Sequence, residues 1–71
     1  MAKRELPLAP IDRLVRRAGA ARVSSEATAA LRDILEDLAV SIGKSAVELA
    51  RHSKRTTVVE DDIKLAFARW Q

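Results

Sequence analysis

Apolar residues recur every three or four positions in three segments of this chain, the spacing of helices with one apolar face. The first segment begins at Pro10, which suits the first turn of a helix because proline lacks an N–H, and Gly19 ends it. The second begins at Ser24, a good N-cap, and continues without proline to Ser53. The third begins with three acidic residues, which the positive end of a helix dipole favours. The pattern predicts helices over residues 10–18, 24–53 and 60–70.

Two short segments separate the predicted helices. Residues 20–23, here called the connector, carry Arg22. Residues 56–59, here called the second loop, read Thr-Thr-Val-Val, and β-branched side chains disfavour a continued helix. Residues 1–6 precede the first helix as an N-terminal arm. We therefore predict an all-α protein with one domain over residues 1–71, in the order short helix, long helix, short helix.

The unequal helix lengths predict a partner. At about 1.5 Å per residue, the second helix is a rod of roughly 40 Å and each short helix covers roughly 15 Å of it. One side of residues 35–46 then stays apolar and uncovered, and such a stripe requires another surface. Gly43 is either a tolerated weak point or a place where a second backbone approaches closely, and the small residues Ala39 and Ala46 favour the second interpretation. We predict an obligate dimer of this chain, or of this chain with a similar one. The predicted dimer core consists of Leu31, Ile34, Leu35, Leu38, Ile42, Gly43 and Ala46.

Composition argues against several classes of function. Without cysteine there is no disulfide or thiolate metal site, and a single histidine does not make a zinc site, so no metal or cofactor is predicted. The sequence shows no nucleophile–base pair and no glycine-rich phosphate loop, so we expect no enzyme and no small-molecule substrate. The charged N-terminus does not resemble a signal peptide, and no apolar run approaches the roughly 18 residues that span a bilayer. We expect a soluble intracellular protein with no membrane partner.

Charge is distributed unevenly along the chain. Residues 1–23 contain six basic and two acidic residues, residues 24–50 two basic and five acidic, and residues 51–71 five basic and three acidic. The net charge of +3 therefore divides into basic ends and an acidic middle. This distribution predicts that the ends bind a polyanion.

Several motifs carry a resemblance to a known family. The segment ELPLAPIDRLVRRAGAARVS and the later segment LARHSKRTTVVEDDIKLAF resemble the minimal, tail-less archaeal histones over Glu5 to Phe67. The most specific parts are LPLAPI, AGAxRVS, LARH and the joint R-x-T-V-x-x-x-D-I. The resemblance implies a histone fold, an intertwined handshake dimer, and wrapping and compaction of double-stranded DNA into chromatin without sequence specificity. It further implies larger superhelical complexes on DNA, paralogous histones as candidate partners, and a cytoplasmic place on the chromosome or nucleoid.

The resemblance assigns DNA contacts to the connector, the second loop and the first helix. In a handshake dimer, the connector of one copy lies beside the second loop of the other. Arg22 matches an arginine that enters the minor groove, and Thr57 matches a threonine that pairs with it. Such an arginine reads groove width rather than bases, and phosphate contacts add affinity with little sequence preference. The implied DNA-binding residues are Arg13, Arg16, Arg17, Arg22, Lys54, Arg55, Thr56 and Thr57.

The remaining assignments concern structure and assembly. Arg55 and Asp62 match a salt bridge across the second loop, although Arg55 could instead contact phosphate. Leu49, His52 and Asp62 match the surface where one dimer meets the next, whereas by itself His52 reads as an exposed helix-end histidine. Gly19 serves as a helix C-cap and also matches a small residue where superhelix turns approach one another.

Two departures and one alternative function stay open. Lys54 stands where many relatives have a glycine, and Thr56 stands where relatives often have lysine, so the phosphate contacts of this loop are not specified in detail. The alternative function is a histone-fold heterodimerisation module of a transcription complex. Arg22, Thr57 and the basic first helix favour DNA wrapping.

Overall fold

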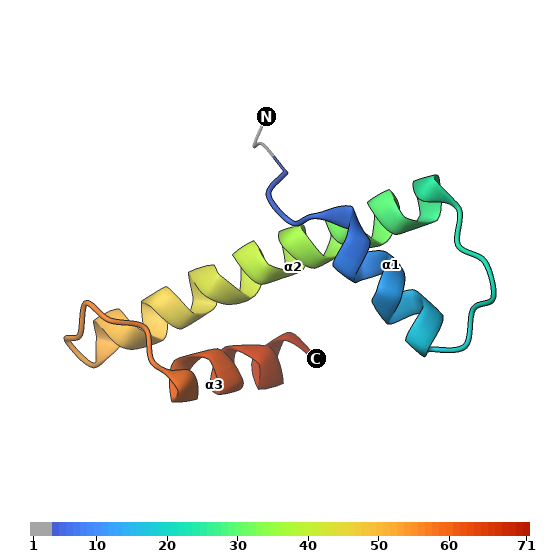
Figure 1. Ribbon diagram of the computed structural model, residues 1–71. Helices are drawn as coiled ribbons and strands as arrows, with labels where there is room; N and C mark the ends of the chain where they lie inside the picture. The colour runs from blue at the N-terminus through green and yellow to red at the C-terminus, as the bar shows by residue number, and fades with distance from the viewer. Residues whose placement is uncertain (1–3) are drawn as a thin grey trace. The chain divides into compact units, whose positions relative to one another are not determined.

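The computed structural model describes residues 4–71, and within them it contains three α-helices and no strand (Figure 1). Helix α1 spans Leu8–Arg17, α2 spans Ser25–His52 and α3 spans Glu60–Trp70. The predicted all-α order of short, long and short helices is confirmed. The chain forms two compact units, one up to Asp37 and one over Leu38–Gln71, so α2 contributes to both. The single domain stays a prediction, and residues 1–3 of the predicted arm lie outside the described residues.

Helix α1 begins two residues before the predicted start. Its N-cap is Pro7, which is extended, and Pro10 is therefore the third residue of the helix. The N–H groups of a first turn have no partner inside the helix, so the missing N–H of Pro10 removes no hydrogen bond there. The prediction took a first-turn proline for the first helical residue, and Leu8 and Ala9 join the helix.

Helix α1 ends in a Schellman motif. The N–H of Gly19 donates to the carbonyl of Arg16 at 3.0 Å, and the N–H of Ala20 donates to that of Val15 at 3.5 Å. Gly19 has a φ of +117°, a conformation that side chains with a Cβ rarely adopt. Ala18 is the C-cap, so the helix ends at Arg17 rather than at the predicted residue 18.

Helix α2 begins after a side-chain cap. The N–H of Ala27 donates to the hydroxyl of Ser24 at 3.0 Å, which satisfies one of the N–H groups that the first turn leaves unpaired. Ser24 is thus the predicted N-cap, and the helix proper starts at Ser25. The hydroxyl of the buried Thr28 donates to the carbonyl of Ser24 at 3.3 Å.

The other end of α2 repeats the Schellman motif without glycine. The N–H of Lys54 donates to the carbonyl of Arg51, and the N–H of Arg55 donates to that of Ala50, both at 2.9 Å. Lys54 holds a φ of +58° and is the non-glycine residue with positive φ within residues 4–71. The helix ends at His52 and not at the predicted residue 53. A lysine in this left-handed conformation costs free energy that a glycine would not.

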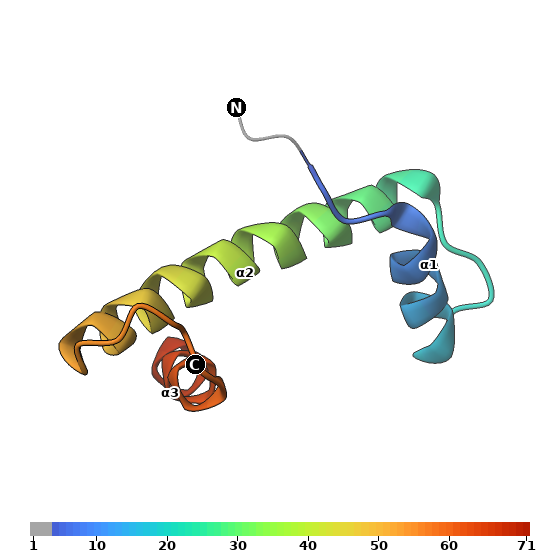
Figure 2. The same ribbon diagram turned by 60° about the vertical axis from the view of Figure 1, so that its left-hand side comes forward.

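Each unit has a thin apolar core. In the first unit α1 lies at a steep angle to the adjoining part of α2 and buries Ile11, and in the second α3 lies beside its part of α2 with its axis turned away from that of α2 (Figure 1, Figure 2). The buried apolar residues of the second unit are Ala46, Ala50 and Ala66. Among residues 4–71, no large side chain is fully buried.

The predicted apolar stripe of α3 is mostly exposed. Ala66 is buried, but Ile63, Phe67 and Trp70 each leave more than two fifths of their surface in solvent. The rings of Phe67 and Trp70 stack with their centroids 6.0 Å apart. In the first unit, Ile34 is 62% exposed. Both units therefore present apolar surface that the described part of the chain leaves uncovered.

Candidate nucleic-acid interface

The basic residues predicted to meet DNA begin on α1. Arg13 and Arg17 are one helical turn apart and are both exposed, so their guanidinium groups share one side of the helix. Arg16 and Arg17 lie in the last turn, where positive charge is favourable to the helix dipole. This side of α1 offers two exposed cations to an anionic partner.

Arg16 has a different environment from its neighbours. Its Nε donates to Oδ2 of Asp12 at 2.9 Å, one turn earlier on α1, and its Nη1 donates to the carbonyl of Ala21 at 3.1 Å. Ala21 belongs to the connector. Asp12, Arg16 and the Ala21 carbonyl are here called the connector clamp, because they tie the connector to the helix before it.

Arg22 follows Ala21 directly and is exposed on the connector. Within residues 4–71 its side chain neither donates a hydrogen bond nor forms an ion pair. The helix end at Gly19, the clamp at Ala21 and the cap at Ser24 hold the backbone on both sides of it. The connector thus presents an unpaired guanidinium from a restrained backbone.

The second loop is held by the predicted salt bridge partners. Nη1 and Nη2 of Arg55 donate to Oδ2 and Oδ1 of Asp62 at 2.8 and 2.9 Å, a bidentate pair. Nη1 also donates to the carbonyl of Thr57 at 3.0 Å, and the N–H of Val59 donates to Oδ2 of Asp62 at 2.9 Å. These groups of Arg55, Asp62, Thr57 and Val59 are here called the loop clamp.

The loop clamp stabilises the ionised form of Asp62. The hydrogen bonds from Arg55 and then that from the Val59 N–H lower the pKa of Asp62 to about 2, although burial acts in the opposite direction. The same pairing raises the pKa of Arg55. Asp62 is also the third residue of α3, where a carboxylate serves the N–H groups of the helix start.

The clamp changes the interpretation of Arg55, which was predicted both to bind DNA and to form the salt bridge. Both terminal nitrogens of its guanidinium are bonded within the chain. Lys54, Thr56 and Thr57 have exposed side chains. The structure therefore places Arg55 in the loop clamp and leaves its three neighbours open to solvent.

Arg4 illustrates a pairing that the charge count did not predict. Its guanidinium bonds Asp37 at 2.9 Å and lies 3.4 Å from Asp33, and the hydrogen bond to Asp37 raises the pKa of Arg4. The N–H groups of Glu5 and Leu6 both donate to the carboxylate of Glu36. The acidic middle of the chain therefore holds the segment before α1, and Arg4 is not one of the unpaired cations of the basic N-terminal end.

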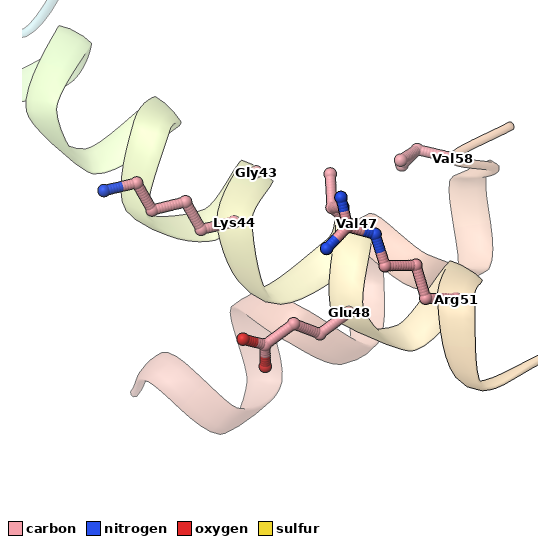
Figure 3. Close-up of a pocket in the computed structure, with 6 residues that line it drawn as sticks. All are labelled: Gly43, Lys44, Val47, Glu48, Arg51 and Val58. Carbon is pink, nitrogen blue, oxygen red and sulfur yellow. The ribbon is translucent and has the colours of Figure 1, made fainter. Parts of the chain in front are cut away.

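A shallow groove lies on the second unit near the predicted dimer core. It has a volume of about 650 Å³ and is lined by Gly43, Lys44, Val47, Glu48, Arg51 and Val58. Gly43, Val47 and Arg51 follow one another along α2, and Val58 faces them from the second loop (Figure 3). A Cβ built on Gly43 meets no atom within 4 Å, so the packing of residues 4–71 leaves room for a side chain at this position.

The other predicted dimer-core residues are unequally available. Ala46 is already fully buried within the chain, so it leaves no surface for a partner to contact. Among the larger side chains, that of Ile34 is exposed. Those of Leu31, Leu35, Leu38 and Ile42 are half-buried.

The predicted surface between dimers lies at the end of α2. His52 is exposed and lines a depression of about 300 Å³ with Glu48 and Arg51. Leu49 is half-buried, and Asp62 is buried in the loop clamp. Because each carboxylate oxygen accepts more than one hydrogen bond, the clamp leaves Asp62 capacity for a further donor.

Comparison with known proteins decides the family. The model of the histone-like transcription factor (CBF/NF-Y) and archaeal histone family matches residues 4–67. The chain is 56% identical to a subunit of archaeal histone HAN1 of Thermococcus zilligii and 45% identical to probable archaeal histone 3 of Methanocaldococcus jannaschii. Each alignment covers 62 residues, 87% of this chain and 92% of the relative. The chain belongs to the archaeal histone family.

Membership in the archaeal histone family gives the three helices their interpretation as a histone fold. It makes the chain a DNA-binding protein of chromatin, from a family of packaging proteins rather than of enzymes. In this archaeal histone, residues 4–71 contain no cluster of His, Asp and Glu that could hold a metal ion. No helix in the same range is long and apolar enough to cross a membrane.

Two functional features of this archaeal histone were missed by sequence reasoning. The contact between Arg16 and Ala21 depends on the path of the connector, which has no periodicity. The pairing of Arg4 with α2 joins residues more than thirty positions apart. The spacing of Asp12 and Arg16 was the one available signal, because residues four apart on a helix are neighbours.

Proposed function

We propose that this chain packages double-stranded DNA without sequence specificity, as dimers that wrap the duplex and add to one another along it. Family membership supports DNA binding itself. The observation that carries the wrapping proposal is Arg22, an unpaired guanidinium on a backbone restrained at Gly19, Ala21 and Ser24. A narrow minor groove has a strongly negative potential that attracts such a group, and it reads groove shape rather than bases.

Substituting Arg22 tests this role. Arg22→Ala should lower DNA affinity and compaction while the dimer and its thermal stability stay unchanged, because the side chain has no partner within residues 4–71. Arg69→Ala is the matched control, since it removes an exposed arginine from α3, outside the proposed interface. Binding of a fixed duplex at several salt concentrations would measure both. Equal losses for the two variants would contradict groove insertion by Arg22 and leave only a general charge effect.

Phosphate contacts should make binding strongly dependent on salt. Arg13, Arg17 and Lys54 are exposed cations placed to neutralise phosphates, and each contact adds about 0.9 to the negative slope of log affinity against log salt concentration. Sequences of similar bendability should bind with similar affinity. A single high-affinity site in a mixed pool of duplexes would contradict the non-specific proposal.

The thin cores of the two units support the proposed dimer. Within residues 4–71 the buried apolar side chains are three alanines and one isoleucine, and Ile34, Val40, Ile63 and Phe67 are exposed. A small domain with so little buried apolar surface is expected to need a partner for stability. A second copy of this chain, or a paralogous histone, would cover these side chains in the handshake arrangement that the family resemblance implies.

Gly43 offers a test of the dimer in which the two interpretations differ in sign. Because a Cβ at this position has open space within the chain, Gly43→Ala should raise helix stability by about 1 kcal/mol if the glycine is only a weak point. If a partner backbone approaches there, as we propose, the added methyl group should weaken the dimer. Sedimentation equilibrium over a range of concentrations would measure the dissociation constant. A tighter or unchanged dimer would contradict close approach at Gly43.

Assembly beyond the dimer is proposed to use Leu49, His52 and Asp62. The depression beside His52 and the remaining hydrogen-bonding capacity of Asp62 support a contact in which the histidine of one dimer meets the aspartate of another. Leu49→Glu should then stop assembly at the dimer, and nuclease digestion should lose the ladder of protected lengths that rises by a constant increment. An undiminished ladder would refute this surface. Gly19 is proposed to lie where successive superhelix turns approach.

A second candidate function is a histone-fold heterodimerisation module of a transcription complex. The family description favours keeping it, because it includes histone-like transcription factors. The two candidates differ in what the purified chain does alone. A folded homodimer that compacts DNA supports packaging, whereas a chain that folds only with a different histone-fold partner supports the alternative. We propose a cytoplasmic, nucleoid-associated place for the packaging protein.

A further inference from the structure

We propose that Arg16 is a positioning residue for Arg22: through the connector clamp it fixes the connector so that Arg22 is held ready for DNA, instead of contacting phosphate itself. This inference rests on the proposed function, because it concerns how the connector presents its arginine. It revises the prediction that Arg16 is one of the DNA-binding arginines on the first helix.

The bonds of the Arg16 guanidinium separate it from Arg13 and Arg17. Its Nε is bonded to the carboxylate of Asp12, and its Nη1 is bonded to the carbonyl of Ala21. The partner carboxylate of Arg16, on Asp12, is only partly exposed. Arg13 and Arg17, in contrast, have exposed side chains that form no ion pair within residues 4–71. The N–H groups of Nη2 and the second N–H of Nη1 keep no partner within residues 4–71, so a phosphate would meet a guanidinium whose position the two bonds already restrict.

The site of the second bond matters for function. Ala21 is bonded through its carbonyl, and that carbonyl belongs to the peptide unit that joins Ala21 to Arg22. Orienting this peptide plane restricts the backbone from which the Arg22 side chain extends. Gly19 lies two residues earlier with a φ of +117°, and glycine leaves the backbone more conformational freedom than any other residue. A contact just after the glycine therefore limits motion where the chain would otherwise be least restrained.

The chemistry of arginine fits this task better than that of lysine. A guanidinium is planar and holds several N–H groups in a fixed fork, so it can donate hydrogen bonds to a carboxylate and to a carbonyl in two directions at once. Asp12 stabilises the charge and limits the rotamers of the side chain, and Nη1 donates to the carbonyl of Ala21 in the connector. A lysine of equal charge is a flexible point charge without this fork.

Restraining the connector before binding has a direct effect on affinity. A side chain or loop that must be ordered on binding lowers the affinity by the entropy lost in ordering it. The connector clamp orders the backbone around Arg22 in the unbound protein, so less ordering remains for the DNA-bound state. Arg16 thus acts on DNA affinity through Arg22.

The experiment compares Arg16→Lys and Asp12→Ala with the wild-type dimer. Under this proposal Arg16→Lys, which keeps the charge, lowers DNA affinity by about fivefold, the effect of losing one modest hydrogen bond. A phosphate contact predicts nearly unchanged affinity for the same variant. Arg69→Lys is the control for the change of arginine to lysine, because Arg69 lies on α3 outside the proposed interface.

Asp12→Ala separates the two roles by the sign of its effect. Removal of a negative charge from a DNA-binding surface raises affinity, and release of Arg16 from its carboxylate would raise it further if Arg16 contacted phosphate. Positioning through the clamp predicts lower affinity despite the added positive charge. Asp61→Ala, which removes an exposed carboxylate outside the connector clamp, shows the size of the charge effect alone. Affinity of Asp12→Ala equal to or above that of Asp61→Ala would overturn the proposal.

Two further measurements exclude a merely structural role. Backbone order parameters from ¹⁵N relaxation should fall at Ala21 and Arg22 in the unbound Arg16→Lys dimer, with α2 and α3 unchanged. In an Arg22→Ala background, Arg16→Lys should have no additional effect on DNA affinity, because the residue through which it acts is gone. Additive losses would overturn positioning. If Arg22→Ala alone leaves DNA binding unchanged, the proposed function of Arg22 fails. If Arg22→Ala weakens DNA binding but Arg16→Lys binds like the wild type, only this inference fails.

Discussion

The connector and the second loop are held in similar ways, each by an arginine that bonds a carboxylate and a main-chain carbonyl. In the loop clamp, the Asp62 side chain is 6% exposed and receives two N–H groups from Arg55 and one from Val59. In the connector clamp, the Asp12 side chain is 32% exposed and receives one N–H from Arg16, which is itself half exposed. The two clamps thus share their chemistry and differ in burial and in the number of bonds.

This difference indicates that the second loop is held more firmly than the connector. A partly buried, bidentate and hydrogen-bonded pair is less screened by salt and more costly to break than an exposed pair on one helix, which contributes little to stability. The second loop is therefore fixed as part of the fold of its unit. The connector is held by a weaker contact, whose main consequence we propose to be the placement of Arg22.

The helix ends that lead into these segments differ in the same direction. The Schellman motif before the connector uses a glycine, and the motif before the second loop uses Lys54 in a left-handed conformation. The strain at Lys54 is tolerated beside the stronger clamp. An exposed lysine next to the second loop is also a candidate phosphate contact, which is a functional reason for a residue other than glycine.

Breaking the two clamps should show the largest contrast. Asp62→Ala leaves the Arg55 guanidinium and the Val59 N–H without their partner, so we expect it to lower the thermal midpoint more than any other substitution proposed for the clamps or the helix ends. Asp12→Ala, in an exposed helical pair, should change stability by less than about 0.5 kcal/mol. Thermal unfolding at one dimer concentration would measure both, with Asp61→Ala as the control for an exposed neighbour of Asp62. Equal falls for Asp62→Ala and Asp12→Ala would remove the contrast.

Acid should release the loop clamp. The pKa of Asp62 is lowered from 3.8 to about 2, so the unfolded state binds a proton more readily than the folded state. The stabilisation from this group is fully present above pH 3.8 and is lost as the pH falls toward 2. Thermal midpoints between pH 5 and pH 2 at constant ionic strength, about the range of carboxylate titration, would show it. The Asp62→Asn variant should show a smaller fall over this range, and an identical fall would contradict the assignment.

Adding a Cβ at the first helix end should destabilise the protein by an intermediate amount. Gly19→Ala places alanine at a φ of +117°, where it is strained although no atom lies within 4 Å of the new Cβ. We expect a loss of about 1–2 kcal/mol from backbone strain alone. Chemical denaturation at fixed protein concentration would measure it. Ala18→Gly, one residue earlier in a right-handed conformation, is the control for a general effect of composition at this helix end.

The opposite substitution at the second helix end should have the opposite sign and the smallest size. Lys54→Gly removes the strain at a φ of +58° and should stabilise the protein by about 1 kcal/mol. If Lys54 contacts phosphate, the same variant should reduce the magnitude of the salt slope of DNA binding by about 1. Lys54→Asn removes the charge while keeping a side chain that tolerates the left-handed conformation. A stabilised Lys54→Gly with an unchanged salt slope would show that the lysine does not bind DNA.

Local sequence was sufficient for the helices and their limits to within two residues. The three- to four-residue spacing of apolar positions, the cap at Ser24, the glycine at 19 and the acids at 60–62 act over a single turn, so they can be recognised without knowledge of the fold. The start of α1 was misplaced because a proline is tolerated anywhere in the first turn. The pairing of Arg55 with Asp62 was inferred from the family resemblance, and the structure has the two side chains in contact.

Tertiary structure alone decided how the charged side chains are used. Arg13, Arg16 and Arg17 were predicted together as DNA-binding residues, but only the path of the connector brings the Ala21 carbonyl to Arg16. In the sequence Arg4 belongs to the basic N-terminal end, but in the structure its guanidinium bonds Asp37, thirty-three residues away. Hydrophobic periodicity is a property of one helix at a time, whereas the partner of an ionic side chain depends on which segments meet. The sequence thus determined the helices, and the packing within each unit determined which arginines remain available to DNA.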